Sequence, residues 1–339
     1  MSLPQIRRRA VSVSQGNQVR AHCLNPDDEF IYVVEPALKH VDLVVWASVN
    51  KDLIESKLYK HGAVLFRGFD VNNSKQFAAF VAVASDHTME YRERSSPRSQ
   101  VGDKVYTSTD YPPDQTIFPH NEHSYSLTFP LKLFFYCDLP APEGGETPLA
   151  DTRKVLQSIT TETRARFAEK KWMYVRNFGD GFGLSWQTVY QTTDKSVVER
   201  YCLNSRIEFE WKDDNRLRTR QVREAMLKHP HTEELTWFNH VTFFHVSTLE
   251  PGLRDAIKAD FDEKDYPNNT YYGDGSPIEP EVLDELREAY RQHLTAFTWQ
   301  RGDIVLIDNM LTSHSRSSYK GERRILFAMS EPFTRSDAI

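Results

Sequence analysis

The chain has 339 residues, a hydrophobic share of 39%, an aromatic share of 12% and a formal net charge of −6. No apolar run approaches the roughly 20 residues that a membrane span needs, and the basic residues form no stripe that would attract nucleic acid. We therefore expect a soluble protein that binds neither membranes nor nucleic acids and whose partner is a small molecule.

Cysteine usage and the N-terminus indicate the compartment. The three cysteines, Cys23, Cys137 and Cys202, are widely spaced and form no C-x-x-C pair, which disfavours a disulfide framework or a zinc knuckle. The first residues lack the apolar stretch of a secretory signal. Both observations favour a cytoplasmic protein.

The chain begins with residues 1–30, which are polar and show no clear period, so we predict a peripheral arm. The apolar run at 61–69 is typical of a buried strand, and Asn73 or Ser74 can cap a helix directly after it. Residues 131–137 form an aromatic strand that ends in a turn at 140–145. We interpret residues 1–339 as a single domain.

The middle of the chain, about residues 151–295, predicts a helical insertion that also carries a lid. Strands are expected again in the C-terminal part. A mainly β protein with a jelly-roll core and helical insertions accounts for this order. The predicted elements are surface helices at 160–170 and 218–228, a flexible loop at 268–275, an amphipathic helix at 277–293, and strands at 296–299, 304–308 and 324–329.

A histidine two residues before an acidic residue, with a second histidine far along the chain, is the sequence pattern of a non-haem iron site. Two imidazoles and one carboxylate bind one face of the metal and leave its other positions open. Because residues i and i+2 of a strand project to the same side, one strand can supply two ligands. The chain contains this pattern three times, at His40 and Asp42, at His120 and Glu122, and at His231 and Glu233.

The surroundings of each pair select His120 and Glu122, which adjoin the aromatic strand. His40 precedes the first clear core strand, and His231 lies in a polar stretch where exposed side chains are expected. The distal ligand would be His314, which follows the apolar strand at 304–308.

Several ordered segments resemble the taurine dioxygenase and clavaminate synthase-like superfamily of iron(II)/2-oxoglutarate-dependent oxygenases. The resemblance covers roughly residues 60–330 and is closest to amino-acid hydroxylases of peptide natural-product pathways. It implies a double-stranded β-helix, or jelly roll, with Fe(II) as cofactor and 2-oxoglutarate and O₂ as cosubstrates. The matching segments are 120–125, 144–151, 237–240, 299–309, 314–316 and 321–325.

The resemblance also implies roles for individual residues. His120, Glu122 and His314 would be the metal ligands, and Thr147 would donate a hydrogen bond to 2-oxoglutarate. An arginine would bind the distal carboxylate of 2-oxoglutarate, since its planar fork can bind a carboxylate bidentately. Of the neighbouring Arg323 and Arg324, only one can face the pocket from a strand, and we predict Arg324.

Two departures from related enzymes restrict the chemistry. Taurine dioxygenase binds its sulfonate with an arginine four residues after the cosubstrate arginine, and Ala328 stands at that position here, so we do not expect a sulfonate substrate. Halogenases of this fold replace the carboxylate ligand with a small residue, whereas this chain has Glu122. Halogenation is therefore not expected.

Other residues near the motifs leave their roles open. His123, Tyr125 and Trp186 could contact the substrate or could be structural. His123 could also donate a hydrogen bond behind the metal ligands. His240 and His245 lie among aromatic residues, which favours a place in the core or in the pocket wall.

These observations predict hydroxylation of an unactivated C–H bond in a small polar substrate, with release of succinate and CO₂. An amino acid or amino-acid derivative of secondary metabolism, free or tethered to a carrier protein, is the substrate class that the resemblance implies. The same cofactor chemistry could give desaturation or ring closure. The alternatives from other classes are a metal-dependent hydrolase and a noncatalytic jelly-roll binding protein.

Overall fold

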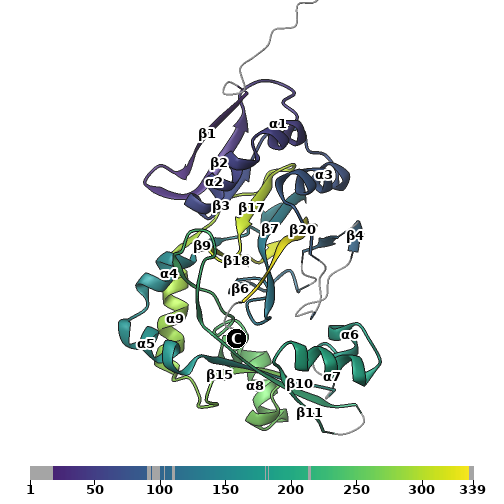
Figure 1. Ribbon diagram of the computed structural model, residues 1–339, viewed down its shortest axis with the longest axis vertical. Coiled ribbons are helices and arrows are strands. Elements are labelled where there is room, and N and C mark those ends of the chain that lie inside the picture. The colour runs from purple at the N-terminus through teal and green to yellow at the C-terminus, as the bar shows by residue number, and fades with distance from the viewer. Residues whose placement is uncertain are drawn as a thin grey trace, which may run out of the picture.

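A large mixed sheet forms the centre of the molecule in the computed structural model (Figure 1). The structure describes residues 18–89, 93, 100–102, 104–108, 111–179, 181, 183–212 and 215–335. Neighbouring strands of this sheet are antiparallel except β2 and β3, which are parallel. Its strands, in spatial order, are β1 (Val19–Asn25), β2 (Asp28–Pro36), β3 (Ala63–Phe66), β17 (Ile304–Asp308), β7 (Thr128–Leu139), β20 (Arg324–Thr334), β5 (Val105–Thr107) and β4 (Gln100–Gly102).

Three helices cover one face of the large sheet: α1 (Leu43–Val49), α2 (Lys51–His61) and α3 (Ser74–Ala84). The Asn73 side chain accepts a hydrogen bond from the backbone of Gln76, so Asn73 caps α3 as the sequence predicts. The predicted strands at 61–69, 131–137, 304–308 and 324–329 are confirmed as β3, β7, β17 and β20. These strands are buried on both faces, which explains their nearly continuous apolar sequence.

A smaller antiparallel sheet packs against the other face of the large sheet. Leu149 of the small sheet joins the apolar cluster that contains Leu133 and Phe327 of the large sheet. The expected mainly β class with helices is confirmed at this level. The small sheet has the order β16 (Leu294–Thr295), β9 (Leu149–Asp151), β18 (Thr312–Arg316), β6 (Ile117–His120). A separate short pair consists of β8 (Glu143–Gly144), which precedes β9 in the chain, and β19 (Tyr319–Lys320), which follows β18.

Residues 151–295 hold helices and a further antiparallel sheet. Figure 1 shows this sheet with α6, α7 and α8 at the opposite end of the molecule from α1 and α3. Two predicted helices are confirmed as α5 and α9. The elements are α4 (Thr152–Ser158), α5 (Thr161–Lys170), β10 (Trp172–Phe178), α6 (Trp186–Tyr190), α7 (Lys195–Asn204), β11 (Glu208–Trp211), β12 (Leu217–Arg223), β13 (Met226–Lys228), β14 (Leu235–Trp237), η2 (Val246–Thr248), α8 (Pro251–Asp260), η3 (Glu263–Asp265), β15 (Asn268–Tyr272) and α9 (Pro280–Gln292).

Three local predictions for this part of the chain and the segment after it are wrong. The predicted helix at 218–228 is instead two strands of different sheets, β12 and β13, and alternate residues of β12 are buried while their neighbours are more exposed. The predicted flexible loop at 268–275 begins with β15, which pairs with β10. Residues 296–299 form no strand, and only the two residues before them pair with β9.

None of the helices in the described part of the chain has the length and apolar character of a membrane span.

Candidate metal centre and cosubstrate pocket

Two histidines face each other across paired strands of the small sheet. His120 is the last residue of β6 and lies opposite His314 of β18, with 4.3 Å between the ring centroids. The Nδ1 of His120 is 2.9 Å from the carbonyl oxygen of Phe118. Because a carbonyl can only accept, Nδ1 carries the proton, which leaves the Nε2 lone pair to bind a metal.

Glu122 reaches the two histidines from a turn. The sequence predicted that one strand carries both His120 and Glu122, but β6 ends at His120 and Glu122 lies in the turn that follows. His123, with a φ of 56°, adopts the left-handed conformation in this turn. The turn buries the Glu122 carboxylate and brings its Oε2 to 3.9 Å from Nε2 of His314.

The ligand atoms of His120, Glu122 and His314 all lie within 4.8 Å of one another, and we call these three residues the metal group. The separation of the Glu122 oxygen from His314 is too long for a hydrogen bond. Two imidazoles and a carboxylate that converge on one point suit a divalent first-row metal. In the part of the chain that the structure describes, no other cluster of histidine, cysteine and acidic side chains has this geometry.

The two competing motifs do not form metal groups in the described chain. The exposed His40 side chain lies 3.4 Å from Asp70, and Asp42 caps α1. His231 stacks on Tyr59, with 5.1 Å between ring centroids. The sequence indicated this outcome for His40 by its place before the first clear core strand and for His231 by its polar surroundings.

A cavity of about 410 Å³ opens beside the metal group. His120 and His314 form part of its wall, and the large sheet contributes Phe135 and Ile325. Its walls combine aromatic and aliphatic side chains with a few polar groups, as small-molecule sites commonly do. The lining includes Tyr111, Phe118, Thr147, Phe243, Phe244, Leu249, Glu250, Leu253, Asn268, Arg316 and Arg323.

The prediction that Arg324 rather than Arg323 faces the pocket is wrong. Arg323 lines the cavity, where its Nη2 lies 3.4 Å from the Thr147 hydroxyl and its Nε donates to the carbonyl of Gly145 at 2.8 Å. Arg324 is half exposed and pairs with Asp138 outside the cavity. The alternation of β20 explains the difference, because Ile325 and Phe327 belong to the apolar cluster beside the metal group, whereas Leu326 belongs to the cluster under the helices.

Burial and, to a smaller extent, the nearby positive charge of Arg316 together lower the pKa of Arg323 to about 10. Arg323 makes no ion pair with a carboxylate of the described residues. Thr147 also accepts a hydrogen bond from Trp299 Nε1 at 3.1 Å. A buried cation beside an oriented hydroxyl forms a binding place for an anionic group.

Arg316 is a cavity residue that the sequence analysis did not single out. Its guanidinium donates to the carbonyls of Tyr111 and Gln115 at 2.9 and 2.8 Å, and so holds the loop between them against β18. The signal was available, because Arg316 lies two residues after His314 and therefore faces the same side of a strand.

The three residues considered for substrate contact lie outside the described lining of the cavity. His123 is buried with its Nε2 3.7 Å from a carboxylate oxygen of Glu122, so it lies behind the metal group. Tyr125 is buried and donates its hydroxyl hydrogen to the carbonyl of Glu93 at 2.9 Å. Trp186 packs against Trp211 in a separate apolar cluster. Gly183, three residues before Trp186, does line the cavity.

His240 occupies the aromatic surroundings that the sequence indicated. His240 is buried, stacks on Phe244 and contacts the His120 ring at 5.5 Å between centroids. Burial lowers the pKa of His240 well below its ordinary value, and the charges of neighbouring histidines add to this effect. His245 begins the short helix η2 and accepts a hydrogen bond from the backbone of Ser247.

Comparison with known proteins places this geometry in a family. The profile of the taurine catabolism dioxygenase TauD, TfdA family matches residues 31–330. The chain belongs to this family. It is therefore an iron(II)- and 2-oxoglutarate-dependent dioxygenase, as the sequence motifs indicated. Membership of this family disfavours both the hydrolase and the noncatalytic binding protein.

Two relatives match over nearly the whole chain. The dapdiamide synthesis protein DdaC of Enterobacter agglomerans is 38% identical over 312 residues, which cover 89% of this chain and 95% of DdaC. A clavaminate synthase-like protein of Arabidopsis thaliana is 30% identical over 304 residues, which cover 87% of this chain and 89% of that protein.

Solved structures share the fold at low identity. PvcB of Pseudomonas aeruginosa aligns with a TM-score of 0.56 and 15% identity over 95% of this chain and 94% of PvcB. PvcB has been described as an Fe, alpha-ketoglutarate dependent oxygenase from an isonitrile synthetic pathway. A taurine dioxygenase from Burkholderia xenovorans aligns with a TM-score of 0.55 and 15% identity over 95% of this chain and 93% of that chain.

Proposed function

We propose that this dioxygenase hydroxylates an unactivated C–H bond of a small polar substrate, an amino acid or amino-acid derivative of secondary metabolism. The observation that carries the proposal is the convergence of the metal group, Arg323 and Thr147 on one cavity. We infer that the two facing sheets are the double-stranded β-helix core that holds this site.

In this proposal His120, Glu122 and His314 bind ferrous iron through two imidazole nitrogens and one carboxylate oxygen. With iron and 2-oxoglutarate bound, the site would supply the chemistry that couples oxidation of a substrate C–H bond by O₂ to the conversion of 2-oxoglutarate to succinate and CO₂. The protein orients the ligands through contacts such as the one between His120 and the carbonyl of Phe118. The buried setting of Glu122 keeps bulk water away from the reacting centre.

Arg323 and Thr147 would bind the distal carboxylate of 2-oxoglutarate. The carboxylate would place a negative charge beside the buried guanidinium and accept a hydrogen bond from the threonine hydroxyl. Four residues beyond Arg323, on the same face of β20, stands Phe327, which is fully buried. The absence of a second cation at Phe327 agrees with the expectation that the substrate is not a sulfonate.

The remainder of the cavity would hold the substrate. Phe118, Phe243 and Leu253 give it apolar walls, while Glu250 and Asn268 supply polar groups that can orient a small polar molecule. The relationship to DdaC, a protein of dapdiamide synthesis, supports a substrate from natural-product metabolism. Whether the substrate is free or tethered to a carrier protein decides how it enters, and we include both forms in the test.

A substrate screen tests the proposed reaction. Purified protein with ferrous iron, 2-oxoglutarate and O₂ is incubated with free amino acids, their acyl derivatives, and the same groups as carrier-protein thioesters. Succinate release and product mass are then measured. We expect one class to stimulate succinate release and to gain one oxygen atom. A product that has lost two hydrogen atoms instead would contradict hydroxylation and establish desaturation or ring closure.

A further inference from the structure

Asn309, which directly follows β17, makes two hydrogen bonds to the backbone of Glu122. The backbone N–H of Glu122 donates to Asn309 Oδ1 at 2.8 Å, and Asn309 Nδ2 donates to the carbonyl of Glu122 at 2.8 Å. Nδ2 also donates to the carbonyl of Pro130 at 2.8 Å. The amide thus supplies the donor and acceptor that a neighbouring strand would supply, although Glu122 lies in a turn.

The contact between Asn309 and Glu122 holds the backbone of Glu122, which strand pairing does not fix as it fixes His120 and His314. His120 and His314 lie on strands that pair with each other, so backbone hydrogen bonds fix their relative positions. Glu122 lies beyond the end of β6. Both partners are buried, and a buried peptide group left without a hydrogen-bond partner is unfavourable, so the Asn309 amide strongly favours one position of the Glu122 backbone.

A second amide joins the same two segments in the opposite direction. Asn121 Nδ2 donates to the carbonyl of Asn309 at 2.7 Å and to the carbonyl of Thr312 at 3.2 Å. The segment that carries Glu122 and the segment that leads to His314 are therefore held together by four side-chain hydrogen bonds before any metal binds.

Asp308 fixes the turn that presents Asn309. Its Oδ1 accepts hydrogen bonds from the backbone N–H groups of Met310 and Leu311 at 2.9 and 3.0 Å. This is an aspartate-capped turn, which defines the backbone on both sides of Asn309. A buried carboxylate needs a further partner for its second oxygen.

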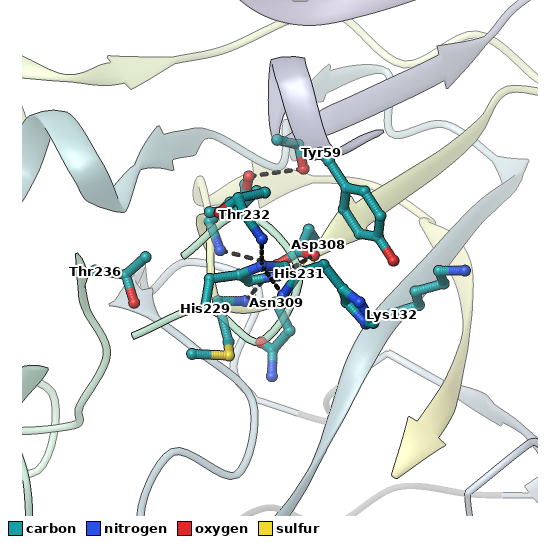
Figure 2. Close-up of polar contacts among 12 residues, drawn as sticks. Tyr59, Lys132, His229, His231, Thr232, Thr236, Asp308 and Asn309 are labelled. Atoms are coloured by element: carbon teal, nitrogen blue, oxygen red, sulfur yellow. Dashed lines mark hydrogen bonds and ion pairs between the residues drawn. The ribbon is translucent and has the colours of Figure 1, made fainter. Parts of the chain in front are cut away.

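That partner is His229, from the loop before β14. Figure 2 shows His229 beside Asp308 and Asn309; the distance from His229 Nε2 to Asp308 Oδ2 is 2.9 Å. His229 Nδ1 accepts hydrogen bonds from the backbone N–H groups of Thr232 and His231 at 3.0 and 3.2 Å. Because Nδ1 is an acceptor, the proton of the neutral ring is on Nε2, and His229 donates to Asp308. Both side chains are almost fully buried.

We propose that Asn309 is a positioning residue that sets the place of the Glu122 carboxylate for metal binding, and that His229 acts on the same ligand through Asp308. The inference rests on the proposed role of Glu122 as a metal ligand. It adds that metal affinity depends on side chains that touch neither the metal nor the cavity lining.

The test compares Asn309→Ala with Asn177→Ala as a matched control. Asn177 is also buried and also donates from its side chain to two backbone carbonyls, those of Tyr266 and Lys264, but it contacts neither segment of the metal group. Co²⁺ is titrated into each metal-free protein, and its visible absorption reports both the dissociation constant and the coordination geometry. We expect Asn309→Ala to weaken Co²⁺ binding about 10- to 100-fold and to change the spectrum. Asn177→Ala should match the wild type.

A second measurement distinguishes weaker metal binding from a general loss of stability in the variants. For Asn309→Ser and His229→Gln, the unfolding midpoint is measured with and without Co²⁺, so that each variant serves as its own reference for general destabilisation. If Co²⁺ binds more weakly, adding it should raise the unfolding midpoint of both variants by less than it raises that of the wild type. The inference would be overturned if the Asn309 variants bound Co²⁺ with the wild-type dissociation constant and if Co²⁺ raised their unfolding midpoint as much as it raises that of the wild type. Failure of the wild-type protein to bind Co²⁺ would instead contradict the proposed function.

Discussion

The guanidinium of Arg323 lies 3.4 Å from the hydroxyl of Thr147, while the neighbouring Arg324 points away and pairs with Asp138. This relationship assigns the two arginines different roles. Arg323, which directly precedes β20, lines the cavity, and Arg324, the first residue of β20, lies at the surface.

We predict that Arg323→Gln weakens binding of 2-oxoglutarate to the iron-loaded protein by about thirtyfold or more, because loss of a buried charged partner costs at least about 2 kcal/mol. Arg324→Gln is the matched control and should change the affinity by less than about threefold, since exposed ion pairs contribute little. Anaerobic isothermal titration of 2-oxoglutarate measures both. A larger loss in Arg324→Gln would reverse the assignment.

The Thr147 hydroxyl gives a second, smaller prediction. Thr147→Val keeps the shape of the side chain but removes a hydrogen bond to a charged carboxylate, so 2-oxoglutarate should bind about tenfold more weakly. Thr236→Val is the control, because Thr236 is buried but donates to the carbonyl of Leu227, outside the cavity lining. Equal affinities in the two variants would argue against a role for Thr147.

A buried histidine predicts how stability responds to acid. Burial and, to a smaller extent, the nearby charge of Arg287 together lower the pKa of His245 to about 4. The unfolded chain takes up this proton near pH 6.5, so between about pH 6.5 and 4 it binds more protons than the folded protein, and stability falls as the pH falls. His245→Gln should reduce the acid-dependent fall of the unfolding midpoint in this range. The exposed His40→Gln should not, and an unchanged profile in His245→Gln would contradict the prediction.

The buried carboxylate of Glu93 predicts a loss of stability away from the cavity. The hydroxyl of Tyr201 donates to Glu93 Oε2 at 2.7 Å, and Ser126 donates to the same oxygen at 3.0 Å. Tyr201→Phe removes one donor from a buried charge, so we expect the free energy of unfolding to fall by about 1.5–3 kcal/mol in urea denaturation. A change below about 0.5 kcal/mol would show that water replaces the tyrosine hydroxyl.

The elements that could be predicted from the sequence have strong local signals. The apolar residues of α9 recur at helical spacing, and Asn73 marks the start of α3 with a capping side chain. The strand β12 was missed because its buried residues include Thr219, Gln221 and Arg223, so the alternation of burial is not an alternation of hydrophobicity. Polar residues that face inward hide a strand from such analysis.

The metal group could be located because several short matching segments lie in a fixed order along the chain, but its finer geometry could not be predicted. Alternation along β20 shows that Arg323 and Arg324 face opposite sides, yet only the packing of the two sheets decides which side holds the cavity. The contact between Asn309 and Glu122 joins residues 187 positions apart, so no local sequence pattern predicts it.

The central claim is that the metal group binds ferrous iron together with 2-oxoglutarate. Anaerobic titration of both into the purified protein, followed by optical absorption, tests it most directly, with His314→Ala as the control. The account predicts a metal-to-ligand charge-transfer band that appears in the wild type and is lost in the variant. Iron binding without this band, or an equal band in His314→Ala, would contradict it.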